Sequence, residues 1–192
     1  MACLLRGTLS PNIMKQNNNL SICSFNCRSV KNSVYEIQSL CDKYDVVLIQ
    51  EHWLLPNELE FLNNIHPDFL AYGHSAVDIS QGILIGRPYG GTAILYRKTL
   101  STSISRLLAC NDRVTAVTLH TEVGPVLIAC VYMPTDYGSP ECVEEYIATC
   151  ASVTACGEPP RHQVTTRRAA LSLDIRHCTV HRYCAVYLVV RV

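Results

Sequence analysis

The sequence has little charge, and most of it lacks the basic excess that suits non-specific binding to nucleic acid. Charged residues make up 17% of the 192 residues, and the formal net charge is zero. Residues 1–157 carry 10 basic and 14 acidic side chains, whereas residues 158–192 carry six arginines against Glu158 and Asp174. A strong electrostatic footprint for DNA is therefore absent from the body of the chain. An acidic body is compatible with a site for a metal cation, although a solvated surface explains most of these charges.

The sequence also lacks a targeting segment and any apolar run long enough to cross a bilayer. The apolar stretch in Met1–Ser10 is too short for a signal peptide, and Cys184–Val192 is too short for a membrane helix. The 11 cysteines are odd in number and have no repeated spacing, which indicates reduced thiols and no disulfide framework. We therefore expect an intracellular protein with no membrane contact, in either the nucleus or the cytoplasm.

Neither internal repeats nor low-complexity tracts are present, and the length favours one domain. A chain of this size buries about 70% of its unfolded surface when it folds. Residues 1–19 are expected to be a polar lead-in, and residues 20–155 the folded body. Residues 156–192 differ in character, because a Gly-Glu-Pro-Pro break precedes a basic segment. The β-prone stretch Thr179–Val192 has no clear partner strand.

Three apolar runs of strand length each end on a polar side chain. They are Leu20–Asn26, Asp45–Glu51 and Val126–Tyr132. The Val-Val-Leu-Ile of the second run is typical of a strand buried on both faces. Strands that end on an amide, a carboxylate and a phenol indicate a sheet that delivers side chains to one edge, which is where open α/β sheets bind ligands.

Helices are expected between these strands. Ser29 is a candidate cap for a helix that ends near Lys43, and Pro56 can open a second, short helix. Ser139-Pro140-Glu141 is a strong helix start. The apolar spacing after it predicts a buried stripe of four residues, Val143, Tyr146, Ile147 and Cys150.

Four segments of the sequence form an ordered set of motifs: Ser24-Phe25-Asn26-Cys27-Arg28-Ser29, Leu48-Ile49-Gln50-Glu51-His52-Trp53-Leu54, Arg87-Pro88-Tyr89-Gly90-Gly91-Thr92-Ala93-Ile94-Leu95 and Val131-Tyr132-Met133-Pro134. In this order they resemble the endonuclease/exonuclease/phosphatase superfamily, and most of all the endonuclease domains of non-LTR (LINE-type) retrotransposons. Each alone is a weak signal, but four at compatible distances are specific. The resemblance covers about residues 20–155.

The resemblance implies an α/β fold, a two-sheet sandwich with outer helices, of which this chain holds the N-terminal part. It implies that Glu51 binds Mg²⁺ or Mn²⁺ through carboxylate oxygen. Asn26 would orient phosphate or water, and Tyr132 would donate to a phosphate oxygen. Gly90 and Gly91 would let backbone approach the rim closely, and His52 is a candidate rim or substrate-contacting residue.

The second half of the family's site is not found in this sequence. The resemblance implies a Gly-Asp-Phe-Asn-like strand end that activates water and a Ser-Asp-His-like element that holds phosphate. No Asp-x-Asn is present, and Asp174 and His177 are three positions apart in no matching context. We therefore expect a truncation or a reading-frame break near residue 155, and little or no activity from this chain alone.

Three functions remain open at this point. The first is part of a retrotransposon DNA endonuclease, with DNA as substrate and a reverse-transcriptase domain in the intact element. The second is a non-catalytic remnant that binds nucleic acid or a partner. The third is a phosphoesterase of the same fold with another substrate, because fold alone does not choose among substrates. Each site residue also has a structural reading, such as a turn residue at Asn26 or a strand-end tyrosine at Tyr132.

Overall fold

The computed structural model of the chain describes eight segments, with gaps between them. These are residues 5–8, 19–80, 82, 86–108, 111–122, 124–134, 139–156 and 185–190, and the backbone alone is described for 5–8, 19, 154–156 and 185–190. Asp174 and His177 lie outside these residues. Among the described helices, none has both the length and the apolar character that a membrane span requires.

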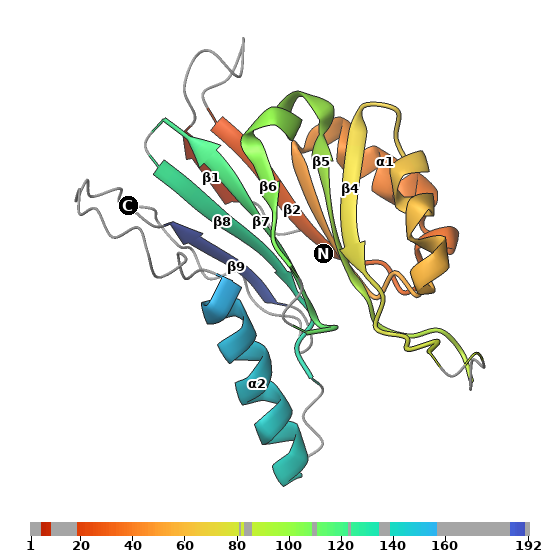
Figure 1. The fold of residues 1–192 in the computed structure, drawn as a ribbon. Helices are drawn as coiled ribbons and strands as arrows, with labels where there is room; N and C mark the ends of the chain where they lie inside the picture. Colours follow the sequence, from red (N-terminus) through yellow and green to blue (C-terminus); the bar gives the residue numbers. More distant parts are fainter. Residues whose placement is uncertain are drawn as a thin grey trace.

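Two β-sheets pack face to face (Figure 1). The first sheet has the order β1 (Leu5–Thr8), β2 (Asn19–Asn26), β3 (Val46–Gln50), β5 (Thr92–Arg97) and β4 (Phe69–His74). The second has the order β6 (Ile104–Arg106), β7 (Val114–Thr121), β8 (Gly124–Val131) and β9 (Ala185–Val190). β2 and β3 are parallel, and the other neighbours are antiparallel. The expected two-sheet sandwich is confirmed.

The strand β3 is the centre of the first sheet, and all five of its residues are buried. Val47 and Ile49 face the helices outside the sandwich, whereas Val46 and Leu48 face the second sheet. This alternation follows from the two-residue period of a strand. The prediction of a strand buried on both faces is confirmed. β3 is buried because helices cover one face of the first sheet and the second sheet covers the other.

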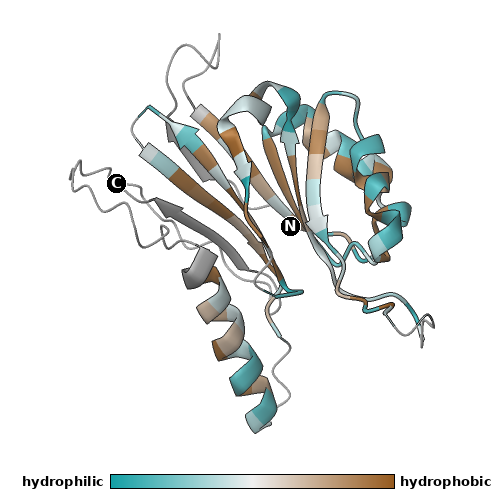
Figure 2. Cartoon of the chain, in the orientation of Figure 1, coloured by the Kyte–Doolittle hydropathy of each residue, from teal (hydrophilic) through white to brown (hydrophobic). Residues whose placement is uncertain are grey.

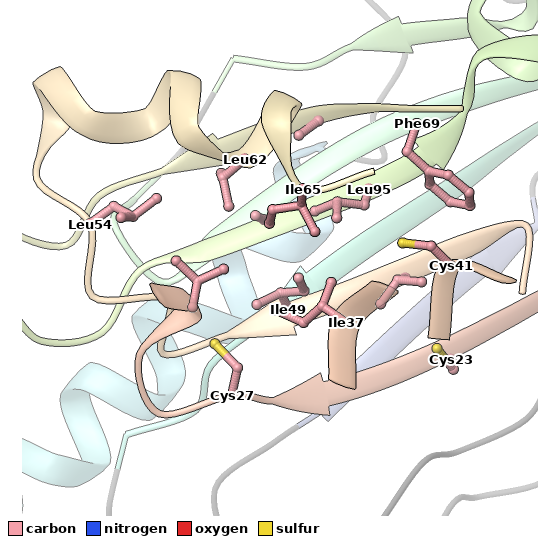
Figure 3. Packing of buried hydrophobic residues seen from close by; sticks show 14 residues of the cluster. Cys23, Cys27, Ile37, Cys41, Ile49, Leu54, Leu62, Ile65, Phe69 and Leu95 are labelled. Carbon is pink, nitrogen blue, oxygen red and sulfur yellow. The ribbon is translucent and has the colours of Figure 1, made fainter. Parts of the chain in front are cut away.

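The outer face of the first sheet is covered by α1 (Val34–Lys43) and by the 3₁₀ segment η2 (Pro56–Asn64). Figure 3 shows Ile37 and Cys41 of α1 packed with Ile49 of β3 and Leu95 of β5. Two further 3₁₀ segments are η1 (Val30–Asn32) and η3 (Lys98–Ser103). Figure 2 shows brown, hydrophobic residues along the strands of both sheets and teal, hydrophilic residues on α1 and η2.

The first helix begins later than the sequence predicts. Ser33, not Ser29, precedes α1, and Ser29 has φ 89°. The backbone N–H of Ser29 donates to the Glu51 carbonyl at 2.9 Å, and that of Val30 donates to the His52 carbonyl at 3.1 Å. These two bonds hold the chain against the end of β3, where only the short 3₁₀ segment η1 forms, and the α-helix begins after it.

The buried stripe predicted for α2 (Pro140–Cys156) is wrong at three of its four positions. Val143, Tyr146 and Ile147 are 57%, 50% and 61% exposed, and Cys150 is half-buried. The helix instead packs against the outer face of the second sheet through Val153. This residue lies in the C-terminal half of α2, which is the half nearer that sheet (Figure 1). Helical spacing shows which residues share a face, but not how far the sheet beneath them extends.

Two terminal segments are paired, contrary to expectation. Leu5–Thr8, in the expected lead-in, is β1 and pairs with β2, while Ala185–Val190 is β9 and pairs antiparallel with β8 from Val126↔Val190 to Val131↔Ala185. The expectation that the β-prone tail lacks a partner strand is therefore wrong for these six residues. β9 lies far from β8 in the sequence, so their pairing leaves no local pattern by which it could be predicted.

The structure describes the side chains of six cysteines, and four of these are buried: Cys23, Cys27, Cys41 and Cys130. Burial raises the pKa of the Cys23 and Cys41 thiols to about 12. These thiols therefore stay protonated and pack as small apolar groups.

Shortening Ile128 should cost far more stability than shortening Ile147. Ile128 is fully buried between the sheets, so Ile128→Ala should lower the free energy of unfolding by about 2–5 kcal/mol. Ile147→Ala removes the same atoms from an exposed position and should change it by less than about 0.5 kcal/mol. Urea denaturation of both variants measures the difference, and equal losses would show that the outer face of α2 is covered.

Candidate functional site

Asn26 and Glu51 meet at one edge of the first sheet. The parallel register of β2 and β3 places Asn26 opposite Gln50, so the next residue, Glu51, follows at the same edge. The side-chain amide Nδ2 of Asn26 donates to Oε1 of Glu51 at 2.7 Å. The structure therefore brings together two of the three residues to which the resemblance assigns chemistry.

The side-chain oxygen of Asn26, Oδ1, is buried without a hydrogen-bond partner among the described residues. A buried acceptor without a partner is costly, and native proteins rarely tolerate one. Because Nδ2 is held by Glu51, Oδ1 is available for a donor or a cation from outside the chain.

The chemistry of this pair fits Mg²⁺ or Mn²⁺. Both ions prefer oxygen ligands, and Mg²⁺ in particular takes one or two protein carboxylates and keeps several waters. Glu51 is half-buried and offers a carboxylate, and Asn26 offers an amide oxygen beside it. In the described ranges no three His, Cys, Asp or Glu side chains gather in a way that could hold a metal ion. A site with one carboxylate and a neighbouring amide oxygen is what these residues provide.

Backbone bonds tie Glu51 to the two segments beside it. Its N–H donates to the Gly91 carbonyl and its carbonyl accepts from Ser29, both at 2.9 Å. Gly90 and Gly91 are buried, with φ 59° and 82°, values that residues with a Cβ rarely adopt. The diglycine backbone therefore contacts the turn that carries Glu51 directly.

Tyr132 lies at the same end of the sandwich, on the second sheet. It follows β8 directly, and two residues earlier the Cys130 thiol donates to the Ile49 carbonyl of β3 at 3.2 Å. The backbone N–H of Tyr132 donates to the Arg113 carbonyl at 2.9 Å, and the Arg113 guanidinium lies 5.6 Å from the centre of the tyrosine ring. Arg113 also pairs with Glu145 of α2. Tyr132 thus follows the last residue of β8, on the opposite sheet from Glu51, and it contacts Arg113.

Residues that the sequence did not single out join the sheets at this end. The buried Thr115 hydroxyl of β7 donates to the Thr92 carbonyl of β5 at 2.9 Å, and it lies 3.1 Å from Nδ1 of His74. Its inward position could be found from strand alternation, but its polar partners could not. Arg28 is exposed beside Asn26 with φ 44°, in the tight turn that leads away from the rim.

His52 lies beneath the rim and not on its surface. The side chain is 1% exposed, Nε2 donates to the His74 carbonyl at 2.9 Å, and Nδ1 accepts from the Leu54 N–H at 3.0 Å. Burial lowers the pKa of His52 to about 4 and also lowers the pKa of His74. The expectation of a substrate-contacting imidazole therefore does not match its place, since both ring nitrogens bond to protein.

The fold and the site together define an α/β sandwich with a polar, carboxylate-bearing rim. The model of the endonuclease/exonuclease/phosphatase family matches residues 23–182, and the chain belongs to this family. The matched range extends beyond residue 155, where the resemblance of the sequence motifs ends. A search of curated proteins found no match to the chain.

Two solved structures are similar to part of this chain. A variant of the 3′ phosphatase NExo from Neisseria, bound to a product DNA hairpin, is 16% identical, with a TM-score of 0.45 over 70% of this chain and 49% of that chain. The 3′-5′ exonuclease NExo from Neisseria meningitidis is 17% identical, with a TM-score of 0.43 over 70% of this chain and 50% of that chain. This chain thus spans about half the length of these two structures.

The neutral state of His52 should make the protein sensitive to acid. The unfolded chain takes up a proton at His52 near pH 6.5, whereas the folded chain does so near pH 4. Stability from this group is complete above pH 6.5 and is lost as the pH falls through about 4, a total of roughly 3 kcal/mol. Urea denaturation from pH 7 to pH 4 should show this loss, and His52→Gln should show a shallower one. An equal slope in both proteins would assign the acid sensitivity to other groups.

Proposed function

We propose that this chain is the metal-binding and phosphate-binding part of a phosphodiesterase of the endonuclease/exonuclease/phosphatase family, and that its substrate is DNA. The observation that carries the proposal is the Asn26–Glu51 contact, with a carboxylate held by an amide whose own oxygen is buried and accepts from none of the described residues. The residues of the four motifs favour the endonucleases of non-LTR retrotransposons as the branch of the family to which the chain belongs. In an intact element a reverse-transcriptase domain would accompany it.

Each rim residue has a role that its chemistry allows. Glu51 would hold Mg²⁺ or Mn²⁺, and Asn26 would keep the Glu51 carboxylate in place through Nδ2 while Oδ1 accepts from a water or another donor. Tyr132, from the second sheet, would donate its hydroxyl to a phosphate oxygen as negative charge increases there. A bound divalent ion would supply positive charge that stabilises the phosphate while a nucleophile attacks it and the leaving oxygen departs.

The chain alone should turn over little or no substrate. The carboxylate that activates water and the imidazole that holds phosphate, which the resemblance implies, have no matching motif in this sequence. Groups of this kind act as a unit, so the loss of two removes nearly all of the rate. Binding of metal and nucleic acid without useful turnover is therefore the activity that we propose for this chain by itself.

Mn²⁺ binding tests the role of Glu51. Glu51→Gln keeps the size of the side chain and removes its charge, so the affinity for Mn²⁺ should fall at least tenfold, which corresponds to about 1.4 kcal/mol. Glu60→Gln is a matched control on the exposed side of η2, and it should bind as the unchanged protein does. Isothermal titration calorimetry on the three folded proteins measures the affinities. Equal affinity in the Glu51 variant and the control would contradict the proposal.

Nicking of supercoiled plasmid DNA tests the prediction about turnover. With Mg²⁺ present, the chain should nick plasmid no faster than its Glu51→Ala variant does. Robust nicking that needs Mg²⁺ and disappears in that variant would show that the chain carries a complete site. A panel of phosphomonoesters and other phosphodiesters, used with the same pair of proteins, would reveal an activity toward a different substrate.

A further inference from the structure

The turn that carries Glu51 has an unusual backbone on both sides of His52. Glu51 has φ 56° and Trp53 has φ 57°, and neither is a glycine. Residues with a Cβ adopt this left-handed region at a cost in conformational free energy, so such a turn persists only where its surroundings determine it strongly. The residue between the two, His52, is the part of the turn that reaches into the protein.

The imidazole of His52 is bonded on both of its edges. Nε2 donates to the carbonyl of His74, the last residue of β4, and Nδ1 accepts from the N–H of Leu54, three residues after Glu51. The ring is neutral with its proton on Nε2, because a carbonyl can only accept and a backbone N–H can only donate. One side chain thus connects the segment after the turn to the far edge strand of the first sheet.

The same ring packs against the diglycine. A Cβ at Gly91 would lie 2.4 Å from Cε1 and 2.5 Å from Nε2 of His52, distances far below van der Waals contact. Gly91 and Gly90 in turn accept the backbone N–H groups of Glu51 and Trp53, at 2.9 and 3.1 Å. Ring, turn and diglycine therefore form one packed unit, in which the absence of a side chain at Gly91 makes room for the ring.

We propose that His52 is a positioning residue for Glu51: its buried imidazole, held between the Leu54 N–H, the His74 carbonyl and Gly91, keeps the turn in the left-handed conformation in which the Glu51 carboxylate meets Asn26. The effect of His52 on metal affinity rests on the proposed function. The effect of His52 on the turn does not rest on the proposed function, because the contacts of His52 with Leu54, His74 and Gly91 are made within the chain. His52 itself touches neither metal nor substrate.

Three substitutions separate the contacts. His52→Gln retains a long side chain with an N–H that can reach the His74 carbonyl, whereas His52→Ala removes both hydrogen bonds and the packing. Gly91→Ala attacks the same contact from the other side by placing a Cβ where the ring lies. His120→Gln is the matched control, because His120 is exposed on β7 and hydrogen-bonds to Ser105 far from the rim.

Two measurements on the folded proteins are needed. The first is Mn²⁺ affinity, which should fall at least tenfold in His52→Ala and Gly91→Ala, fall less in His52→Gln and stay unchanged in His120→Gln. The second is hydrogen exchange of the Glu51 and Trp53 amides, compared with the amide of Val47 inside β3. In the unchanged protein the turn amides should exchange about as slowly as Val47. In His52→Ala they should exchange at least a hundredfold faster relative to Val47.

The outcomes decide between the two proposals. A folded His52→Ala protein with unchanged turn exchange and unchanged Mn²⁺ affinity would overturn the role of His52. If the unchanged protein binds no Mn²⁺, the proposed function fails, and the exchange of the turn amides alone decides the role of His52. If the variants do not fold, the unchanged protein still decides, since fast exchange of Glu51 and Trp53 beside a protected Val47 would show that the turn is not held.

Discussion

The parallel register of β2 and β3 is the constraint on which the site depends. It places Asn26 opposite Gln50, and the next residue, Glu51, then lies within 2.7 Å of the Asn26 amide. A shift of one residue would send these side chains to the other face of the sheet. The buried, alternating strand β3 fixes this register, because its residues must satisfy a helical layer on one face and a second sheet on the other. The chemistry at the edge is thus a consequence of core packing.

Polar contacts join the two sheets at the end where Glu51 lies. Thr115 bonds to Thr92, and Cys130 bonds to the Ile49 carbonyl, while Arg106 of β6 bonds to the Tyr96 hydroxyl of β5 nearer the other end of the sandwich. Buried hydrogen bonds specify one relative position of two surfaces more closely than apolar contact does. They therefore fix the separation between Glu51 on the first sheet and Tyr132 on the second, where a phosphate would be bound under the proposed function.

Much of this arrangement could be predicted from the sequence, because short apolar runs that end on polar residues reveal both the strands and their common edge. Asn26 and Glu51 were found in this way. The buried place of His52 could not be, since it depends on a glycine 39 positions further along the chain. The exposed face of α2 was also missed, because periodicity identifies a shared face and not its cover. The pairing of β9 with β8 depends on a contact between distant segments, which local propensity does not encode.

Paramagnetic broadening by Mn²⁺ in an NMR spectrum tests whether the Asn26–Glu51 pair binds a divalent cation. If it does, substoichiometric Mn²⁺ should broaden the side-chain amide signal of Asn26 first, together with the backbone signals of Glu51 and Trp53. The main competing carboxylates are Glu144 and Glu145 on α2, which are exposed and adjacent in sequence. Broadening confined to that helix, with the Asn26 amide unaffected, would show that the Asn26–Glu51 pair does not bind the cation.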